Sequence, residues 1–307
     1  MNEPILATRG LAKQYGRFTA LQPTSLAVER GQIYGLVGKN GAGKTTLMRL
    51  VTGQALPTVG ELELFGKTTP SGLNGARRRT GAMIETPSFY PYLTAAQNLE
   101  YYRIQRGVTG KGCVPELLKT VELADAGSKK FKDFSLGMKQ RLGLALALLD
   151  HPDLLILDEP INGLDPMGIV GIRSLLLRLN REQGVTILIS SHILSELASL
   201  ATDYGFLDHG VLLEQVSAPD LQAKCRQYLE VAVNDPKLAA VILERDLACT
   251  EFEALPDGTL RLYRFLDEPG RVAAALVAGG LLLNGIEVKG SNLEDYFLRL
   301  IGGELHA

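Results

Sequence analysis

The chain has no tryptophan, only three cysteines and only four histidines among its 307 residues. Cys113, Cys225 and Cys249 are odd in number, widely spaced and form no CxxC pair. A disulfide framework is therefore not expected, and this cysteine usage fits a reducing compartment. The histidines also lie far apart, so the sequence predicts no zinc cluster.

The chain also lacks a large excess of charge of either sign. The formal net charge is −2 with 21% charged residues, and no block of basic residues stands out. We therefore expect a folded globular protein without a nucleic-acid partner.

Long apolar runs and targeting signals are missing as well. The longest apolar segment, Val272 to Ile286, is interrupted by glycines and an asparagine and is too short to span a bilayer. The first residues, Met-Asn-Glu-Pro, lack the basic and apolar parts of a signal peptide. We expect a chain that does not cross a membrane by itself but can dock on a protein that does.

Charge is distributed unevenly along the chain. Residues 1–219 carry a net +3 and residues 220–307 carry a net −5. The change falls near Ser217-Ala218-Pro219, a turn-like stretch. We therefore expect a large domain over 1–219 and an accessory domain over 220–307, because this length suits about two domains.

Short apolar runs alternate with helical patterns in the first region, which predicts an α/β fold with a largely parallel sheet covered on both faces. Strands are expected over Gln32–Val37, Glu61–Phe65, Thr80–Glu85, Leu154–Leu157 and Thr186–Ile189, helices over Lys44–Thr52, Thr94–Arg106, Leu136–Leu149 and Pro166–Asn180, and antiparallel additions over Ile5–Leu11 and Phe18–Val28. The tail predicts a small α+β appendage, with β-like Tyr228–Val233 and Thr259–Phe265 and helical Pro236–Arg245 and Gly270–Ala278.

A glycine-rich loop lies between the first buried strand and the first helix. Its residues, Gly38-Lys39-Asn40-Gly41-Ala42-Gly43-Lys44-Thr45, match the pattern GxxxxGK[ST]. Glycines let backbone N–H groups curl around phosphate oxygens, and the helix N-terminus adds a partial positive charge. We therefore expect Lys44 to reach the β- and γ-phosphates of a nucleotide and Thr45 to bind Mg²⁺. The alternative is a structural glycine turn ahead of a helix.

Two carboxylates end the apolar strand Leu154–Leu157. Asp158 at the strand tip is suited to hold Mg²⁺, and Glu159 can polarise a water against the γ-phosphate. A strand that ends in Asp-Glu is common by itself, so the functional interpretation depends on the presence of the glycine-rich loop. Farther upstream, Ser135 precedes a long apolar helix, where it can bind phosphate or act only as an N-cap.

Together these segments resemble the ATP-binding subunit of ABC transporters over about residues 4–217. The resemblance implies a P-loop NTPase core with a helical subdomain over about 86–150. It also assigns roles: catalysis by Glu159, His192 and Lys44, nucleotide binding by Tyr15, Gly38, Lys39, Asn40, Gly41, Ala42, Gly43, Lys44, Thr45 and Thr46, Mg²⁺ binding by Thr45, Glu85 and Asp158, a signature loop acting on a second protomer at Ser135, Gly137 and Met138, and a D-loop at Asp165.

The resemblance further implies ATP and Mg²⁺ as cofactors and a homodimer or heterodimer that sandwiches ATP. It implies a separate multi-span membrane permease as partner and a peripheral place on the cytoplasmic face of the membrane. The aromatic segment Ser88–Tyr92 lies where such subunits receive their permease, although local packing is the alternative. Arg77-Arg78-Arg79 is interpreted as a solvated basic turn, and contact with a partner is the alternative.

Two departures from the family pattern narrow the resemblance. Glu85 stands where the family usually has Gln, and Ser-Leu-Gly-Met-Lys-Gln stands in place of Ser-Gly-Gly-Gln in the signature loop. A Glu can still ligate Mg²⁺ or orient water, but it adds a negative charge near the catalytic carboxylate. Both departures, with the tail ending Asn292–Phe297, are similar to the subgroup that exports bacitracin-like and lantibiotic peptides.

Three other functions remain open at this point. A soluble ABC-type ATPase usually has two nucleotide domains or a coiled-coil insertion, and neither is present in the sequence. A GTPase would match DxxG at Asp165–Gly168, but no NKxD follows. A non-catalytic nucleotide sensor is disfavoured because Lys44, Asp158, Glu159 and His192 are all retained.

Overall fold

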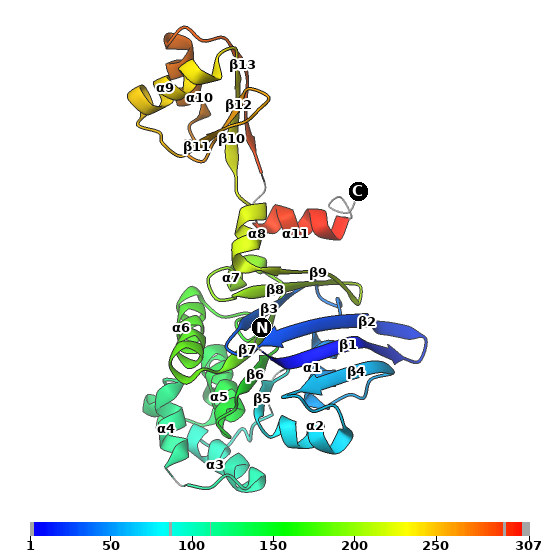
Figure 1. Cartoon of the computed structure of the whole chain (residues 1–307). Coiled ribbons are helices and arrows are strands. Elements are labelled where there is room, and N and C mark those ends of the chain that lie inside the picture. The colour runs from blue at the N-terminus through cyan, green and yellow to red at the C-terminus, as the bar shows by residue number, and fades with distance from the viewer. Residues whose placement is uncertain (1–2, 86–87, 111, 291–292, 303–307) are drawn as a thin grey trace. The chain divides into compact units, whose positions relative to one another are not determined.

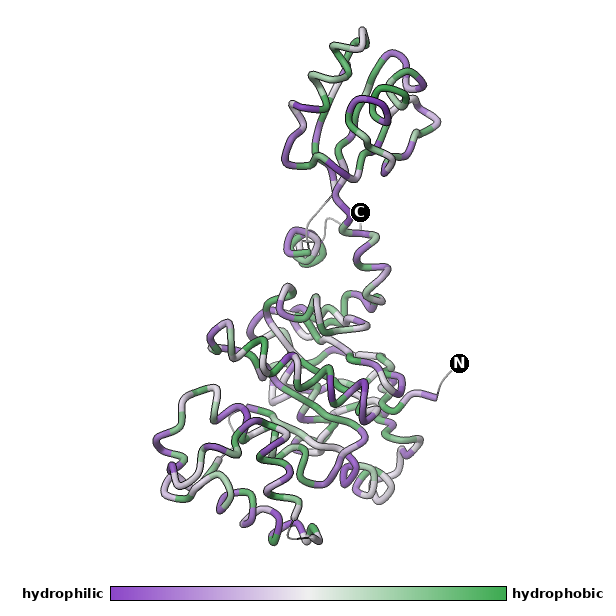
Figure 2. Tube along the Cα trace, turned by 90° about the vertical axis from the view of Figure 1, so that its left-hand side faces the viewer, coloured by the Kyte–Doolittle hydropathy of each residue, from purple (hydrophilic) through white to green (hydrophobic). Residues whose placement is uncertain are grey.

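The structure is a computed structural model that describes residues 3–85, 88–110, 112–290 and 293–302. It divides into two compact units, Met1–Ala218 and Pro219–Ala307. Within each unit, apolar stretches of the tube run through the interior and hydrophilic ones through many of the turns (Figure 2). None of the described helices combines the length and the apolar character needed to cross a bilayer.

A six-stranded sheet forms the centre of the first unit (Figure 1). Its order is β5 (Thr80–Met83), β6 (Leu154–Leu157), β7 (Thr186–Ser191), β3 (Ile33–Val37), β8 (Asp203–Asp208) and β9 (Val211–Ser217). All neighbours are parallel except the pair β8–β9. Every residue of β3, β6 and β7 is buried, as expected of parallel strands covered on both faces. The predicted α/β class is confirmed.

A second, antiparallel sheet of order β2 (Phe18–Glu29), β1 (Pro4–Tyr15) and β4 (Val59–Leu64) lies on the other side of α1 (Lys44–Thr52). One apolar cluster joins the two sheets through α1, with Leu6 and Leu64 on one side, Leu47 on the helix and Leu36 on the other side. This packing fixes α1, and therefore the loop before it, against both sheets.

The other helices of this unit are α2 (Pro70–Arg77), α3 (Ala95–Arg106), α4 (Cys113–Thr120), α5 (Leu136–Leu148), α6 (Pro166–Gln183) and α7 (Leu194–Leu197), with short 3₁₀ turns at Ala124–Ala126 and Phe131–Asp133. The helix predicted over Thr94–Arg106 is confirmed with Thr94 as its N-cap, and Gln97 completes a capping box with Thr94. Pro166 occupies the first turn of α6, also as predicted. Helices α2, α4 and α7 and strands β8 and β9 were not predicted.

The second unit has its own core. Strands β10 (Tyr228–Val233), β11 (Phe252–Ala254), β12 (Thr259–Leu262) and β13 (Leu283–Lys289) form an antiparallel sheet of order β11-β12-β10-β13. Helices α9 (Pro236–Leu247) and α10 (Pro269–Ala278) pack on the sheet through this apolar core, which gives a β-α-β-β-α-β arrangement. Helices α8 (Ala218–Lys224) and α11 (Leu293–Gly302) flank it in sequence.

The predicted strand Thr259–Phe265 is too long. The sequence predicts β structure through Phe265, but β12 ends at Leu262. Phe265 has a φ of +62°, a left-handed conformation that a strand cannot contain, and the chain turns there toward α10.

Candidate functional site

The glycine-rich loop runs from the end of β3 to the start of α1. An added Cβ on Gly38 would lie 2.3 Å from the carbonyl oxygen of Leu207, so no side chain fits there without moving backbone. Gly43 has a φ of +106°, which only glycine adopts without strain. The sequence therefore builds this turn with glycine because backbone from β8 passes directly behind it.

Lys44, the first residue of α1, is only 5% exposed. Its Nζ donates to the carbonyl oxygens of Gly38 at 2.6 Å and Lys39 at 3.2 Å. The same Nζ lies 3.2 Å from Oε1 of Glu159. The buried cation is thus held over the loop by acceptors on one side and by the predicted catalytic carboxylate on the other.

Thr45 and Asp158 meet at the N-terminal end of α1. The Thr45 hydroxyl donates to Oδ2 of Asp158 at 2.7 Å, and the Ser190 hydroxyl donates to Oδ1 of Asp158 at 2.7 Å. The backbone N–H of Asp158 donates to the carbonyl of Met83 on the neighbouring strand at 2.8 Å. Residues of β5 and β7 therefore hold this carboxylate at the carboxyl end of β6, and Thr45 contacts it from α1.

Hydroxyl and carboxylate oxygens are the hard donors that Mg²⁺ prefers. Over the described ranges, no group of three or more His, Cys, Asp or Glu residues is placed to hold a metal ion. The Thr45–Asp158 pair fits the other common arrangement, in which one or two protein oxygens and substrate phosphates share the Mg²⁺.

Glu159 stands between Lys44 and His192. Its Oε2 lies 2.6 Å from Nδ1 of His192, and Nδ2 of Asn162 donates to the same oxygen at 3.3 Å. The backbone N–H of Glu159 donates to the Ser190 hydroxyl at 2.9 Å. Its φ of +48° places a bulky residue in the left-handed region, a strained conformation of the kind that clusters at functional sites.

A cleft of about 210 Å³ lies over the loop. It is lined by Asn40, Gly41, Ala42, Gly43, Lys44, Thr45, Thr46, Glu159, Ala20 and Phe18. Tyr15, predicted to bind nucleotide, is 45% exposed and pairs with Phe18 across the β1–β2 hairpin. Lys13 Nζ lies 4.8 Å from the centroid of the Tyr15 ring. Phe18, which is 65% exposed, is the aromatic residue among those that line the cleft. Its place beside the glycine-rich loop was not predicted.

The signature loop and the D-loop are neighbours. Ser135 caps α5 by accepting from the Met138 N–H at 3.3 Å, and Asp165 caps α6 by accepting from the Gly168 N–H at 2.9 Å. A Cβ on Gly137 would lie 3.7 Å from Cδ2 of Leu164, and one on Gly163 would lie 3.1 Å from Cδ2 of Leu136. The N-termini of α5 and α6 therefore lie close together. Among the described hydrogen bonds, none joins Ser135 or Asp165 to this chain's own glycine-rich loop.

Glu85 lies two residues beyond the end of β5, in a left-handed conformation with a φ of +58°. Its Oε1 forms an ion pair with a guanidinium nitrogen of Arg49 on α1. Within the described residues, Thr45 and Ser190 are the hydrogen-bond partners of the Asp158 carboxylate, and Glu85 is not. The role of Glu85 as a Mg²⁺ ligand therefore stays a prediction.

The aromatic segment after Glu85 is partly exposed. Tyr90 is 44% exposed and Tyr92 is 71% exposed, and the Tyr90 ring packs edge-on against Tyr101 of α3 with centroids 4.8 Å apart. Asn98 ties the segment to α3 by accepting from the Tyr90 N–H and donating to its carbonyl. Two residues of the region, 86 and 87, lie outside the described part of the chain.

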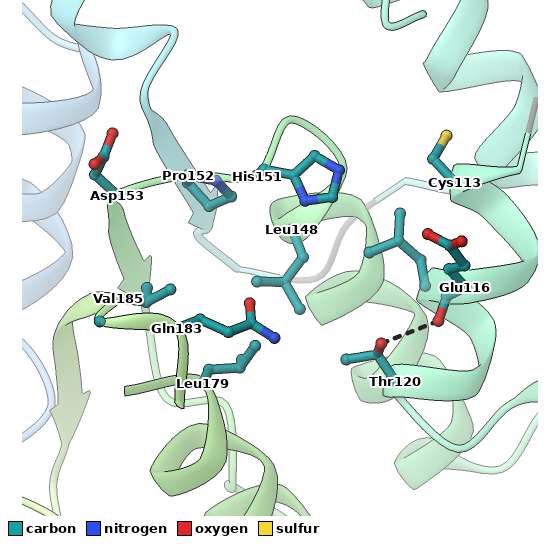
Figure 3. Close-up of a pocket in the computed structure, with 12 residues that line it drawn as sticks. Cys113, Glu116, Thr120, Leu148, His151, Pro152, Asp153, Leu179, Gln183 and Val185 are labelled. Atoms are coloured by element: carbon teal, nitrogen blue, oxygen red, sulfur yellow. Dashed lines mark hydrogen bonds between the residues drawn. The ribbon is translucent and has the colours of Figure 1, made fainter. Parts of the chain in front are cut away.

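A separate hollow of about 340 Å³ lies among α4, the end of α5 and the end of α6 (Figure 3). Cys113, Glu116 and His151 stand at its sides, and Leu148 and Leu179 form part of its apolar floor. The predicted nucleotide-binding and catalytic residues are not among those that line it, so the predicted nucleotide site is the smaller cleft and not this hollow.

Ser190, Asn162 and Phe18 are the site residues that sequence reasoning missed. Ser190 and Asn162 are ordinary residues in a buried strand and in a turn, and their importance follows only from their contacts with Asp158 and Glu159. Phe18 had a weak signal, because Gly16-Arg17 directly before the expected strand Phe18–Val28 marks the tip of a hairpin.

The sequence was compared with known proteins. The ABC transporter family matches residues 21–162. The bacitracin transport ATP-binding protein BcrA of Enterococcus faecalis is 45% identical over 301 residues, which cover 98% of this chain and 97% of that protein. The lantibiotic transport ATP-binding protein SrtF of Streptococcus pyogenes is 41% identical over 212 residues, which cover 69% and 90% of the two chains.

Solved structures give the same result. An ATP binding subunit of an ABC transporter superposes with a TM-score of 0.63 at 30% identity, over 71% of this chain and 92% of that one. A dimeric ATP-binding cassette in a post-hydrolysis state, bound to ADP and Pi, superposes with a TM-score of 0.63 at 25% identity, over 69% and 98%. The resemblance drawn from the motifs is confirmed: the chain belongs to the ABC transporter family, as one of its ATP-binding, ATP-hydrolysing proteins.

Proposed function

We propose that this protein powers the export of an antimicrobial peptide of the bacitracin type through a separate membrane permease. The proposal is supported by likeness to two bacitracin transport ATP-binding proteins, at 45% identity for the one from Enterococcus faecalis and 41% for the one from Bacillus licheniformis. Both matches extend through the second unit, because they cover 98% and 97% of this chain. The protein would then act as a peripheral subunit on the cytoplasmic face of the membrane.

The observation that carries the catalytic part of this proposal is the contact of Glu159 with both Lys44 and His192. Lys44 holds a buried positive charge at the loop, where phosphate oxygens compete with Glu159 for its N–H groups. Glu159 released from Lys44 accepts a proton from water, or orients that water, in line with the γ-phosphate. His192 holds the carboxylate from the far side and contacts the γ-phosphate. Catalysis then depends on positioning and charge stabilisation.

Thr45 and Asp158 are the residues that would hold Mg²⁺. The ion would neutralise the charge that develops on the phosphates. Ser190 keeps Asp158 oriented by its hydrogen bond and also accepts from the Glu159 N–H, so one hydroxyl fixes both carboxylate residues. Glu85 is a further candidate ligand of the ion.

The active form would be a dimer, either of two copies or with a related subunit. Ser135, Gly137 and Met138 do not line this chain's own cleft, so they are available to the nucleotide of a second protomer. An exposed apolar side chain lies at the start of each of the two helices: Leu136 of α5 is 47% exposed, and Met167 of α6 is 77% exposed. An apolar rim of this kind next to two capped helix N-termini suits a closing interface.

The permease would dock on the aromatic segment around Tyr90 and Tyr92. Tyr90, Tyr92 and Tyr101 are all more than 40% exposed, whereas aromatic side chains in a fold of this size are mostly buried. Tyrosine is enriched in protein–protein interfaces because it offers a large apolar ring with a polar end.

ATP hydrolysis by the parent and by Glu159→Gln tests the enzymatic part of the proposal. We expect the parent to hydrolyse ATP in a Mg²⁺-dependent manner and the variant to lose at least about 100-fold in rate while still binding nucleotide. Unchanged turnover in Glu159→Gln would remove Glu159 from its role.

The transport part is tested in cells that depend on the parent protein. Replacing the gene with the Glu159→Gln form should raise bacitracin susceptibility to the level of a deletion. An unchanged susceptibility, with hydrolysis lost in vitro, would show that the cargo is not a bacitracin-type peptide.

A further inference from the structure

The ion pair between Arg49 and Glu85 joins α1 to the segment that follows β5. We propose that Arg49 is a positioning residue that holds the Glu85 carboxylate out of the Mg²⁺ site formed by Thr45 and Asp158. The inference rests on the proposed function, because it assumes a nucleotide-bound Mg²⁺ at that site. It gives Glu85 a resting position in this chain that the family resemblance does not supply.

Helix geometry places the two ends of this device close together. Arg49 follows Thr45 by four residues in α1, so both side chains lie on the same face of the helix, about 6 Å apart along its axis. A carboxylate that contacts the Arg49 guanidinium is therefore about one helical turn from the Thr45 hydroxyl. A glutamate side chain can cross such a distance by changing rotamers.

The backbone on the other side brings Glu85 to the same region. The carbonyl of Met83 accepts the N–H of Asp158 at 2.8 Å, and Glu85 follows Met83 by two residues. The φ of +58° at Glu85 is unfavourable for a residue with a long side chain. Conformations of this kind persist only where the surroundings enforce them, and they cluster at switch regions and active sites. The Arg49 ion pair is the described contact that fixes the Glu85 side chain.

This ion pair is poorly suited to a purely stabilising role. The side chains of Arg49 and Glu85 are 36% and 64% exposed, and exposed ion pairs contribute little to the free energy of unfolding. The pair instead determines where the Glu85 carboxylate lies. With Arg49 present, the charge of this second carboxylate is neutralised and the side chain is directed away from the Mg²⁺ site. Without Arg49, the Glu85 charge is free to approach the ion.

Metal affinity responds directly to the number of carboxylates near a divalent cation. Removing Arg49 should therefore strengthen cation binding, which is the reverse of what damage to the site would do. The effect should vanish when Glu85 is also made neutral. Arg49→Lys, which keeps the positive charge, should behave like the parent.

The experiment measures Mn²⁺ binding to the ADP-loaded protein from the electron paramagnetic resonance signal of free Mn²⁺. We expect Arg49→Gln to lower the dissociation constant for Mn²⁺ at least three-fold and Arg49→Gln/Glu85→Gln to return it to the parent value. Arg9→Gln is the matched control, because Arg9 forms an exposed ion pair with Glu63 at 3.1 Å in the antiparallel sheet, and it should leave Mn²⁺ binding unchanged. A thermal unfolding scan of each variant verifies that it is folded.

Two results would overturn the inference alone: Mn²⁺ binding in Arg49→Gln equal to or weaker than in the parent, or a double variant that binds as tightly as Arg49→Gln. A parent that binds ADP with no additional Mn²⁺ would overturn the proposed Mg²⁺ site and this inference with it. Mn²⁺ binding by the parent protein therefore distinguishes failure of this inference from failure of the proposed Mg²⁺ site.

Discussion

Lys44 Nζ and Glu159 Oε1 lie 3.2 Å apart, and their side chains are only 5% and 19% exposed. Lys44 is the first residue of α1, and Glu159 is the second residue after β6, 115 positions later in the chain. A cation and a carboxylate removed from water to this degree depend on each other, because either one left alone would be a nearly buried, unpaired charge. The residue proposed to bind phosphate and the carboxylate proposed to act in catalysis are therefore coupled in the folded protein.

That coupling predicts a non-additive effect on stability. Lys44→Met should reduce the free energy of unfolding by about 3 kcal/mol, because it removes the lysine charge that faces the nearly buried Glu159 carboxylate. Lys44→Met/Glu159→Gln should lose less than Lys44→Met does, since the neutral amide needs no cation. Urea denaturation of the parent, the two single variants and the double variant measures this. Losses that add up within error would contradict the coupling.

Ser190 should control the Mg²⁺ dependence of hydrolysis. Its hydroxyl donates to Asp158 and accepts from the Glu159 N–H, and the residue is fully buried. Ser190→Ala leaves that N–H without its side-chain acceptor and lets Asp158 rotate, so we expect the Mg²⁺ concentration for half-maximal rate to rise about ten-fold. Rates measured across a Mg²⁺ titration test this. Ser25→Ala, which removes a hydroxyl that accepts from Gly10 far from the site, is the control and should keep the parent curve.

The local motifs were fully readable from the sequence. The predicted helix Lys44–Thr52 and the strand Leu154–Leu157 have the observed bounds, because each has an unambiguous boundary: glycines before the helix, and charged or polar residues on both sides of an apolar run. The first motif follows β3 and the second follows β6. Only β7 lies between these parallel strands, so the sheet brings the two motifs together at the carboxyl ends of its strands.

The contacts between distant segments were not readable. Arg49 and Glu85 are 36 positions apart, and Ser190 lies 32 positions from Asp158. No periodicity marks such pairs, since they arise from the order of strands in the sheet. The sequence also placed Glu85 inside a strand, whereas its left-handed backbone puts it in the loop beyond. Side-chain preferences favour the β region there, and tertiary contacts override them.

Gly38 should tolerate no side chain. In Gly38→Ala the new Cβ would meet the Leu207 carbonyl oxygen at 2.3 Å, which forces backbone of the loop or of β8 to move. We expect at least about 2 kcal/mol of destabilisation together with loss of nucleotide binding. Gly75→Ala is the matched control, because Gly75 lies within α2 with open space around its Cβ position and should gain up to about 1 kcal/mol from helix propensity. Thermal unfolding measures both, and a Gly38→Ala protein as stable as the parent would contradict the packing argument.

Asp153 gives the chain a defined pH dependence. It precedes β6, and its carboxylate accepts from Nε of Arg79 at 2.8 Å, with Arg30 a further 3.6 Å contact. The hydrogen bond from Arg79 holds the pKa of Asp153 below its ordinary value, although partial burial opposes this shift. A carboxylate with a lowered pKa in the folded state stabilises the protein above its unfolded pKa of about 3.9, and this contribution is lost as the pH falls through the folded value.

Asp153→Asn should therefore be less stable than the parent at neutral pH, and the difference should shrink as the pH falls below about 4. The side chains of Arg79 and Asp153 are 49% and 38% exposed, so solvent limits the difference to at most about 1 kcal/mol. Urea denaturation of both proteins between pH 7 and pH 2.5 measures it. A difference that stays constant over this range would show that the variant acts through packing or through the backbone, where the Asp153 N–H donates to the Arg79 carbonyl, and not through the charge of the carboxylate.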